Sequence, residues 1–241
     1  MIQGRKLLEQ GLSQLNIQFT DKQIEQFMKY YDLLIEKNKV MNLTAITDLN
    51  EVMTKHFLDS VLISNVLDMS DFYTLVDVGT GAGFPGIPIK ILFPHLKVTL
   101  IDSLNKRLKF LDDVISELKL DGIETVHGRA EDLGNNDLYR EKYDLCVSRA
   151  VANLSTLSEY CIPFIKKDGV FASYKASDSE EEINNSKNAI KILGGSISNV
   201  CETALPGTEV KRNIVIIKKD KCTSKKYPRK AGLPSKEPLK K

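Results

Sequence analysis

Residues 75–86 have the residue types and spacing that most directly indicate a ligand-binding turn. The segment is LVDVGTGAGFPG, an aliphatic run followed by glycines at positions 79, 81, 83 and 86. Glycine adopts positive φ at little cost and lets the backbone pass close beneath a ligand. Pro85 fits the first turn of a helix, where its missing N–H is not needed. The pattern predicts a strand, a turn and a helix at the ligand crevice of an α/β sheet. A tight turn without a ligand is the alternative.

The acidic residues near this turn bear on which ligand it would hold. Gly81–Gly86 also satisfies the GxGxxG pattern of dinucleotide-binding proteins. Asp77, however, precedes the turn, and we expect its carboxylate to border the crevice, where it would repel a pyrophosphate and attract the cationic S-adenosylmethionine. Asp102, at the end of the next expected strand, can accept hydrogen bonds from the ribose hydroxyls of either ligand. S-adenosylmethionine is therefore favoured over NAD, and an oxidoreductase is further disfavoured by the lack of a convincing catalytic His or Tyr–Lys set.

The elements that must position these residues alternate between β-rich runs and helical patterns. Strands are expected at Thr74–Val78, Lys97–Asp102, Glu124–His127, Tyr143–Ser148, Gly169–Tyr174, Ser196–Thr203 and Asn213–Lys218. Helices are expected at Asn105–Leu118, Leu154–Ile165 and Ser179–Leu193. Only Ala204–Gly207 separates the last two strands, which indicates a terminal hairpin. The chain is therefore predicted to be an α/β protein with a seven-stranded, mostly parallel sheet and helices on both faces.

The segments before and after this alternating region have different textures. Helical periodicity dominates up to residue 67, with a cap at Thr20 or Asp21 and a later helix at about residues 49–67. We expect three parts, namely a helical extension packed on the core (1–69), a doubly wound core (70–219) and a basic tail (220–241). The prolines and glycines of the tail predict a flexible or partner-ordered segment without regular elements.

Composition and charge limit the class of protein. The 241 residues, 42% hydrophobic and 27% charged, are typical of a soluble globular chain, and no apolar run approaches the roughly 18–20 residues of a membrane helix. No signal peptide is recognised, so we expect a cytoplasmic protein with four reduced cysteines and no metal site. Residues 218–241 contain ten basic and two acidic side chains, whereas the rest contain 24 and 30. A basic tail on an acidic body indicates a polyanionic partner, with a solubilising tail as the alternative.

Several motifs resemble those of one family, in the same order along the chain. They are NKVMNLTA (38–45), HFLDS (56–60), DVGTGAGFPGIPIKILFP (77–94), GRAE (128–131), SRA (148–150) and KYPRKAGLPSKEPL (226–239). They are similar to signatures of the RsmG/GidB family, bacterial methyltransferases of guanine N7 in 16S rRNA. The resemblance implies a class I (Rossmann-like) methyltransferase fold, S-adenosylmethionine as cofactor and the 530 loop as target. It also implies cofactor contacts at Gly79, Phe84, Ala130, Glu131 and Arg149, to which our interpretation of the turn adds Gly81 and Asp102.

The residues after the fourth expected strand bear on the nucleophile. Ser148-Arg149-Ala150 lacks the Asn/Asp-Pro-Pro-aromatic pattern of enzymes that methylate exocyclic amines. Cys146 and Cys161 fit core positions better than a nucleophilic loop. Guanine N7 has a free lone pair and no proton to remove, so a site without an obvious general base is consistent with it. We assign no catalytic side chain.

Several polar side chains have two interpretations. Arg149 is expected to hold the cofactor carboxylate or an RNA phosphate, with a structural ion pair as the alternative. Glu131 is expected to accept a hydrogen bond from the adenine amino group. His56 and Asp59, at i and i+3 of a helix, are interpreted as structural residues. Lys175 either reaches RNA or is solvated.

RNA contacts are expected mainly in the tail, at Lys225, Lys226, Arg229, Lys230 and Lys236. The partner would be 16S rRNA, an assembling particle or the small ribosomal subunit, bound by a monomer through its tail and N-terminal helices. Truncation near Lys219 is expected to weaken RNA binding and spare cofactor affinity. A non-catalytic ribosome-binding factor that keeps the cofactor pocket is the remaining rival.

Overall fold

The computed structural model describes residues 2–149 and 151–239, and its seven strands form one sheet in the order β3-β2-β1-β4-β5-β7-β6. The strands are β1 Thr74–Val78, β2 Lys97–Asp102, β3 Ile123–His127, β4 Tyr143–Arg149, β5 Ile165–Ala176, β6 Gly195–Ala204 and β7 Lys211–Lys219. The first five are parallel, and β7 runs antiparallel to both β5 and β6. The predicted α/β class, mostly parallel sheet and terminal hairpin are confirmed.

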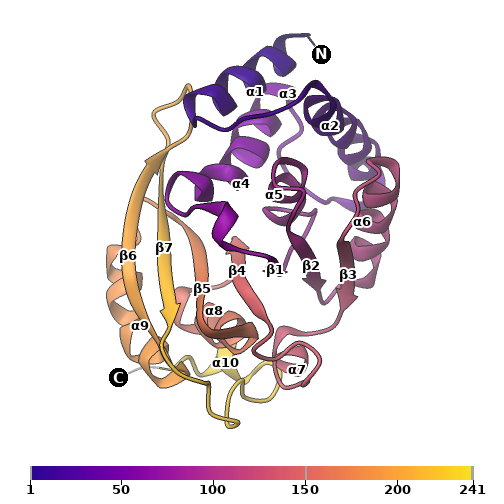
Figure 1. Ribbon diagram of the computed structural model, residues 1–241. Helices are drawn as coiled ribbons and strands as arrows, with labels where there is room; N and C mark the ends of the chain where they lie inside the picture. Colours follow the sequence, from indigo (N-terminus) through magenta and orange to yellow (C-terminus); the bar gives the residue numbers. More distant parts are fainter. Residues whose placement is uncertain (1, 150, 240–241) are drawn as a thin grey trace.

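Helices cover both faces of the sheet (Figure 1). They are α1 Ile2–Gln14, α2 Asp21–Met41, α5 Gly86–Leu92, α6 Asn105–Glu117, α7 Ala130–Leu133, α8 Leu154–Cys161, α9 Glu180–Leu193 and α10 Leu233–Lys236. Successive strand residues point to opposite faces, and accordingly Leu75 joins the core beneath α5, α6 and the N-terminal helices, whereas Val76 joins the core beneath α8 and α9. No helix of the described residues is long and apolar enough to cross a membrane.

The N-terminal helices share one hydrophobic core with the sheet. Thr20 caps α2 through a capping box with Gln23, which decides between the two predicted caps. The expected helix at residues 49–67 is divided into α3 Leu49–Val52, a π-helical turn Met53–Leu58, α4 Asp59–Val61 and a 3-10 turn Leu62–Asn65. A second 3-10 turn, Met69–Asp71, leads into β1. π-Helical turns are rare and frequently lie at functional sites, and this one carries His56.

The C-terminal segment 220–239 is folded against the body, so the prediction of a tail without regular elements is wrong. It ends in the short helix α10, which contacts α8 (Figure 1). Arg229 forms an ion pair with Glu159 of α8, whose side chain is fully buried. The carbonyls of Thr223 and Tyr227 accept hydrogen bonds from Arg140. Side chains of the body thus satisfy backbone groups of this segment outside its one short helix. Lys240 and Lys241 lie outside the described residues.

Candidate functional site

The glycine-rich turn stands at the carboxyl edge of the sheet, between β2 and β4. Its first two amides, Gly79 N–H and Thr80 N–H, donate to the Ile101 carbonyl at 2.9 and 3.0 Å. Gly79, Gly81 and Gly83 all have positive φ, at 74°, 63° and 99°. These conformations are disfavoured for residues with a Cβ. The glycines of the sequence pattern therefore shape the turn.

Asp77 does not border the crevice, which corrects the expectation from sequence. Its side chain is fully buried beneath the turn, where Oδ2 accepts hydrogen bonds from Thr80 Oγ1 at 2.7 Å and from Gly86 N–H at 2.9 Å. Burial raises the pKa of this carboxyl to about 6. A Cβ at position 86 would lie 2.8 Å from Asp77 Oδ2, so the glycine there makes room for the carboxylate. Asp77 fixes the turn and is not a wall for a ligand.

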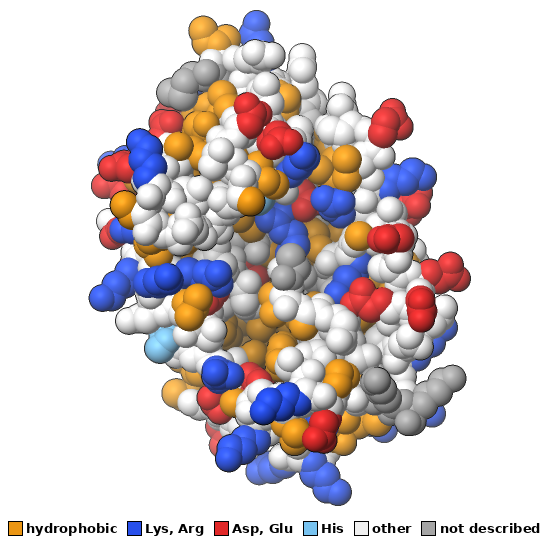
Figure 2. Space-filling view, turned by 180° about the vertical axis from the view of Figure 1, so that it is seen from behind, with side chains coloured by type: hydrophobic (Ala, Val, Ile, Leu, Met, Phe, Trp, Pro, Cys, Tyr) orange, Lys and Arg blue, Asp and Glu red, His pale blue; other side chains and the backbone are white. Residues whose placement is uncertain are grey.

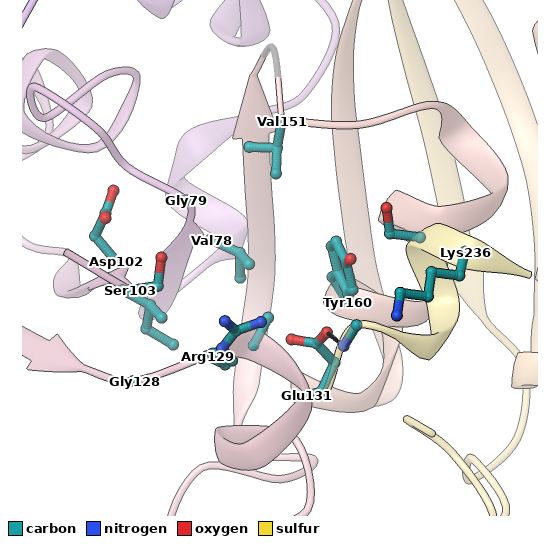
Figure 3. A pocket seen from close by; sticks show the side chains of 14 residues that line it. Val78, Gly79, Asp102, Ser103, Gly128, Arg129, Glu131, Val151, Tyr160 and Lys236 are labelled. Carbon is teal, nitrogen blue, oxygen red and sulfur yellow. Dashed lines mark hydrogen bonds between the residues drawn. The ribbon is translucent and has the colours of Figure 1, made fainter. Parts of the chain in front are cut away.

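Three adjoining cavities lie along this edge of the sheet. The strand-tip pocket, about 380 Å³, is lined by Gly79, Asp102, Ser103, Ala130, Glu131, Tyr160 and other residues (Figure 3). The turn pocket, about 430 Å³, is lined by Thr44, His56, Gly81, Phe84, Asp102, Arg149 and others. The basic pocket, about 470 Å³, is lined by Lys55, His56, Asp59, Arg149, Tyr174, Lys175, Ala176 and Arg212. Asp102 and Gly79 line the first two, and His56 and Arg149 line the last two, so the three are neighbours in a row.

Every residue predicted to contact the cofactor lines the strand-tip pocket or the turn pocket. Asp102, only 3% exposed, lines both, and its Oδ2 accepts from Gly81 N–H at 3.0 Å. Its Oδ1 accepts from Leu104 N–H at 2.8 Å. Oδ2 also pairs with Arg107 Nη1 at 3.4 Å. The carboxylate therefore joins the end of β2 to the turn, and its Oδ1 keeps a lone pair for a ligand.

The C-terminal segment forms a wall of the strand-tip pocket, which the sequence did not reveal. Glu131 Oε1 accepts a hydrogen bond from Gly232 N–H at 2.8 Å, drawn as a dashed line in Figure 3. Gly232, Ser235 and Lys236 all line the cavity. The side chain of Lys236 extends from the C-terminal segment toward Glu131 (Figure 3). Lys236, predicted as an RNA contact, thus also faces this pocket.

Phe84 is the centre of a small aromatic group in the turn pocket. The His56 ring stacks on it with centroids 4.6 Å apart, and the Arg149 guanidinium carbon lies 5.3 Å from its centroid. Thr44 Oγ1 is 2.8 Å from His56 Nε2, and the Asn38 side chain holds the Thr44 backbone through two hydrogen bonds. Burial and the nearby Arg149 charge lower the pKa of His56 to about 4, so the imidazole is neutral at neutral pH. The loop at residues 38–45 therefore reaches the site through His56.

Asp59 links two arginines in the basic pocket. Its Oδ2 accepts from Arg149 Nη1 at 2.7 Å and its Oδ1 from Arg212 Nε at 2.9 Å, while the Asp59 side chain is only 4% exposed. These bonds tie α4 to β4 and β7, in agreement with the structural interpretation of Asp59. Arg149 forms the ion pair named as its alternative and also lines two pockets, so the two interpretations are compatible. Ala150 of the same motif lies outside the described residues.

The predicted RNA-binding lysines differ in their surroundings. Lys225, Lys226 and Lys230 are exposed. Arg229 instead donates three hydrogen bonds to Glu159 through its side chain, and this ion pair speaks against its predicted role toward RNA. Lys175 is not a solvated lysine, since its Nζ donates to Ala152 O at 2.9 Å and Glu182 Oε1 at 2.7 Å.

Metal-ligating residues do not cluster in the part of the chain that the structure describes. Within residues 2–149 and 151–239, no group of three or more His, Cys, Asp or Glu side chains is arranged to hold a metal ion.

Known proteins similar to this chain were found by sequence and by structure. The family model for GidB, rRNA small subunit methyltransferase G, matches residues 23–215. The ribosomal RNA small subunit methyltransferase G of Acetivibrio thermocellus is 53% identical to this chain, and the match covers 98% of this chain and 96% of the length of that protein. The proteins of that name from Lactobacillus helveticus and Bacillus subtilis are 54% and 49% identical, each over 95% of this chain and 96% of their own length.

Solved structures share the fold at low sequence identity. A crystal structure of an MtNAS mutant in complex with S-adenosylmethionine has a TM-score of 0.53 at 14% identity, and covers 82% of this chain and 73% of that one. The same mutant in a second crystal structure gives a TM-score of 0.53 at 15% identity, with 80% and 74% covered. These likenesses agree with a Rossmann-like methyltransferase fold.

Proposed function

This chain belongs to the GidB family, rRNA small subunit methyltransferase G, and from that premise we propose that it transfers a methyl group from S-adenosylmethionine to N7 of a guanine in the 530 loop of 16S rRNA. We further propose that it acts in the cytoplasm as a monomer. The residues that carry the proposal are those of the three pockets along the carboxyl edge of the sheet.

The strand-tip pocket suits the adenosine half of the cofactor. Val78, Ile101 and Tyr160 provide apolar walls, while Asp102 and Glu131 provide acceptors for hydroxyl and amino hydrogens. Gly79, Gly81, Phe84 and Arg149 would border the methionine half in the turn pocket. The cofactor supplies the reactive methyl group. Arg149 pairs with Asp59 through Nη1, so the other edge of its guanidinium is suited to bind the methionine carboxylate.

The observation that carries the choice of N7 is the lack of a free proton acceptor among the described side chains of the turn pocket. Its carboxylate, Asp102, is engaged by two backbone N–H groups and by Arg107. His56 is neutral and a weak base. Methylation of an exocyclic amine requires loss of a proton, whereas N7 attacks through a lone pair that is already free. The protein then has only to align nucleophile and methyl group, and such positioning contributes on the order of 7–11 kcal/mol.

Two measurements test the proposal. Small-subunit rRNA from a strain lacking the gene would be incubated with the protein and S-adenosylmethionine carrying a labelled methyl group, and the product mapped by mass spectrometry. We expect label on one 7-methylguanosine in the 530 loop; label on another atom or in another loop would overturn this target. Calorimetry should show binding of S-adenosylmethionine and not of NAD. Cofactor binding without incorporation would favour a non-catalytic ribosome-binding factor.

A further inference from the structure

The basic pocket is a charged cavity that shares only Arg149 with the proposed cofactor contacts. Four cationic side chains line it, those of Lys55, Arg149, Lys175 and Arg212, against the single carboxylate of Asp59. On the face turned away from the viewer of Figure 1, Lys and Arg side chains gather around the hollowed centre (Figure 2). A cavity lined by this excess of positive charge selects anions.

The arginines of the pocket have hydrogen-bond donors to spare. Arg149 uses only Nη1, and Arg212 uses Nε and Nη1, in the bonds that they make to described residues. Nη2 of each guanidinium donates to no described residue. Asp59 already accepts one hydrogen bond on each oxygen and so orients both side chains. An arginine fixed on one edge presents its other edge to a phosphate or carboxylate.

The other polar groups of the pocket add no negative charge that would repel an anion. Tyr174 Oη donates to the Ser60 carbonyl at 2.6 Å, and His56 is neutral. Glu182 and Glu51, the partners of Lys175 and Lys55, are not part of the lining, and the Lys55–Glu51 pair is the more exposed of the two. The pocket is therefore suited to one anionic group held mainly by Arg212 and Lys55, with Arg149 shared with the turn pocket.

From this arrangement we propose that the basic pocket binds a backbone phosphate of the RNA, next to the guanosine whose base enters the turn pocket. The proposal rests on the function proposed above and names the subsite that positions the substrate. His56 and Arg149 line both cavities, so a nucleotide turned out of its stack could place its base in one and a flanking phosphate in the other. The cofactor carboxylate offers the same anionic oxygens and is the competing occupant.

Two single variants and a matched control test the phosphate subsite. Arg212→Gln removes the main guanidinium, and Lys55→Gln removes a charge without touching Asp59. Lys211→Gln is the control, because Lys211 precedes Arg212 on β7 but pairs with exposed Glu202 and lines none of the three pockets. Each would be assayed for kcat/KM with 16S rRNA at saturating cofactor, for RNA affinity by filter binding and for S-adenosylmethionine affinity by calorimetry.

For the pocket variants, kcat/KM and RNA affinity should fall about tenfold with Arg212→Gln and severalfold with Lys55→Gln. Each should lower the slope of log affinity against log salt by roughly 0.7, the value for one phosphate contact on a single strand. Cofactor affinity should stay within about twofold, and Lys211→Gln should match the wild type. Thermal melting would show whether Arg212→Gln remains folded; Lys55→Gln leaves the Asp59 bonds intact.

Either of two results would overturn the subsite. One is unchanged RNA affinity and kcat/KM in Lys55→Gln and in folded Arg212→Gln. The other is a loss of cofactor affinity with unchanged RNA affinity, which would assign the pocket to the methionine carboxylate. If the wild type transfers no methyl group, the proposed function fails, yet the filter-binding comparison still decides whether the pocket holds an RNA phosphate.

Discussion

Among single residues, Gly79 is constrained by both its backbone and its neighbour. Its φ is +74°, and a Cβ at this position would lie 2.6 Å from Cγ2 of Val151, which lines the same two pockets. Gly79→Ala would force Val151 or the turn to move where we propose that the cofactor binds. We expect the Kd for S-adenosylmethionine to rise at least tenfold, which corresponds to about 1.4 kcal/mol, as measured by calorimetry.

The backbone cost of this substitution can be separated from its effect on the pocket. Gly207, in the β6–β7 hairpin, has a φ of +71°, and a Cβ there would meet nothing within 4 Å. Gly207→Ala should therefore lower stability by about 1–2 kcal/mol, through conformational strain alone, and leave cofactor affinity unchanged. Retained cofactor affinity in a folded Gly79→Ala protein would contradict our placement of the ligand.

His56 gives the fold a pH dependence of definite sign. Burial, together with the Arg149 charge, lowers its pKa from the ordinary 6.5 to about 4. Between pH 6.5 and 4 the imidazole is protonated in the unfolded chain but stays neutral in the folded protein. The stability that comes from the neutral, buried imidazole is therefore complete above pH 6.5 and is lost as pH falls toward 4. The free energy of unfolding of the wild type, relative to His56→Gln, should drop by up to about 3 kcal/mol over this range.

Denaturant titrations at pH 7.5 and 4.5 would measure this difference. The raised pKa of Asp77 has the opposite sign, since a carboxyl that protonates more readily when folded gains stability below pH 6. Asp77 is present in both proteins, so its effect cancels in the comparison. His127→Gln, a change at an exposed position of β3, should keep the wild-type profile. A His56→Gln protein with that same profile would show that the imidazole is not held neutral.

At the scale of elements, the C-terminal segment belongs to the strand-tip pocket. The sequence led us to expect that truncation would spare the cofactor, whereas the contacts of this segment with the pocket lead us to expect the opposite. A chain ending at Lys230 keeps the Arg229–Glu159 pair but loses the Gly232 N–H bond to Glu131 and the wall residues Ser235 and Lys236. We expect its Kd for S-adenosylmethionine to rise about tenfold, because one side of the pocket would open to water and leave Glu131 without its donor.

The full-length double variant Lys225→Gln/Lys226→Gln is the control for that truncation. Both lysines are exposed and line none of the three pockets, so it should bind S-adenosylmethionine like the wild type in the same calorimetric assay. Equal cofactor affinity of the truncated and full-length proteins would mean that α10 covers the pocket without stabilising what binds there.

Elements are predictable from sequence where local pattern decides them. β1 and β2 begin and end at the predicted residues because an aliphatic run, a turn and buried neighbours on both faces leave no competing structure. The orientation of the Asp77 side chain was not predictable, since it depends on how the turn folds back over the strand and brings Gly86 N–H to the carboxylate. The π-helical turn at His56 and the docked C-terminal segment likewise depend on partners distant in sequence, such as Glu159 for Arg229.

The same distinction separates the predictable from the unpredictable parts of the site. Gly79 and Phe84 were named from the family resemblance, and Asp102 from its place at the end of the second strand. They line adjoining pockets because parallel strands bring their carboxyl ends to one edge of the sheet. Arg212 carries no local signal, and Lys236 was predicted only as an RNA contact. They reach the pockets because β7 pairs with β5 and because the C-terminal segment packs on α8. Such residues become visible only in three dimensions.

For the whole molecule, the distribution of charge decides how it meets RNA. Residues 1–217 hold 24 basic and 30 acidic side chains, so this part of the chain carries a net negative charge, which repels a polyanion. The positive charge is concentrated in the C-terminal segment and around the basic pocket, both beside the carboxyl edge of the sheet. RNA held by the segment would therefore lie next to the cavities, and affinity should depend strongly on salt.

Removing three exposed charges measures the contribution of the C-terminal segment. Lys225, Lys226 and Lys230 are exposed, and each phosphate contact contributes roughly 0.7 to the slope of log affinity against log salt. The triple Gln variant should therefore lower that slope by about 2, in filter binding between roughly 50 and 200 mM salt. S-adenosylmethionine affinity should stay unchanged. A triple Gln variant at exposed Lys167, Lys187 and Lys191 makes the same change in net charge away from the three pockets. If both variants lower the slope equally, RNA responds to total charge and not to the C-terminal segment.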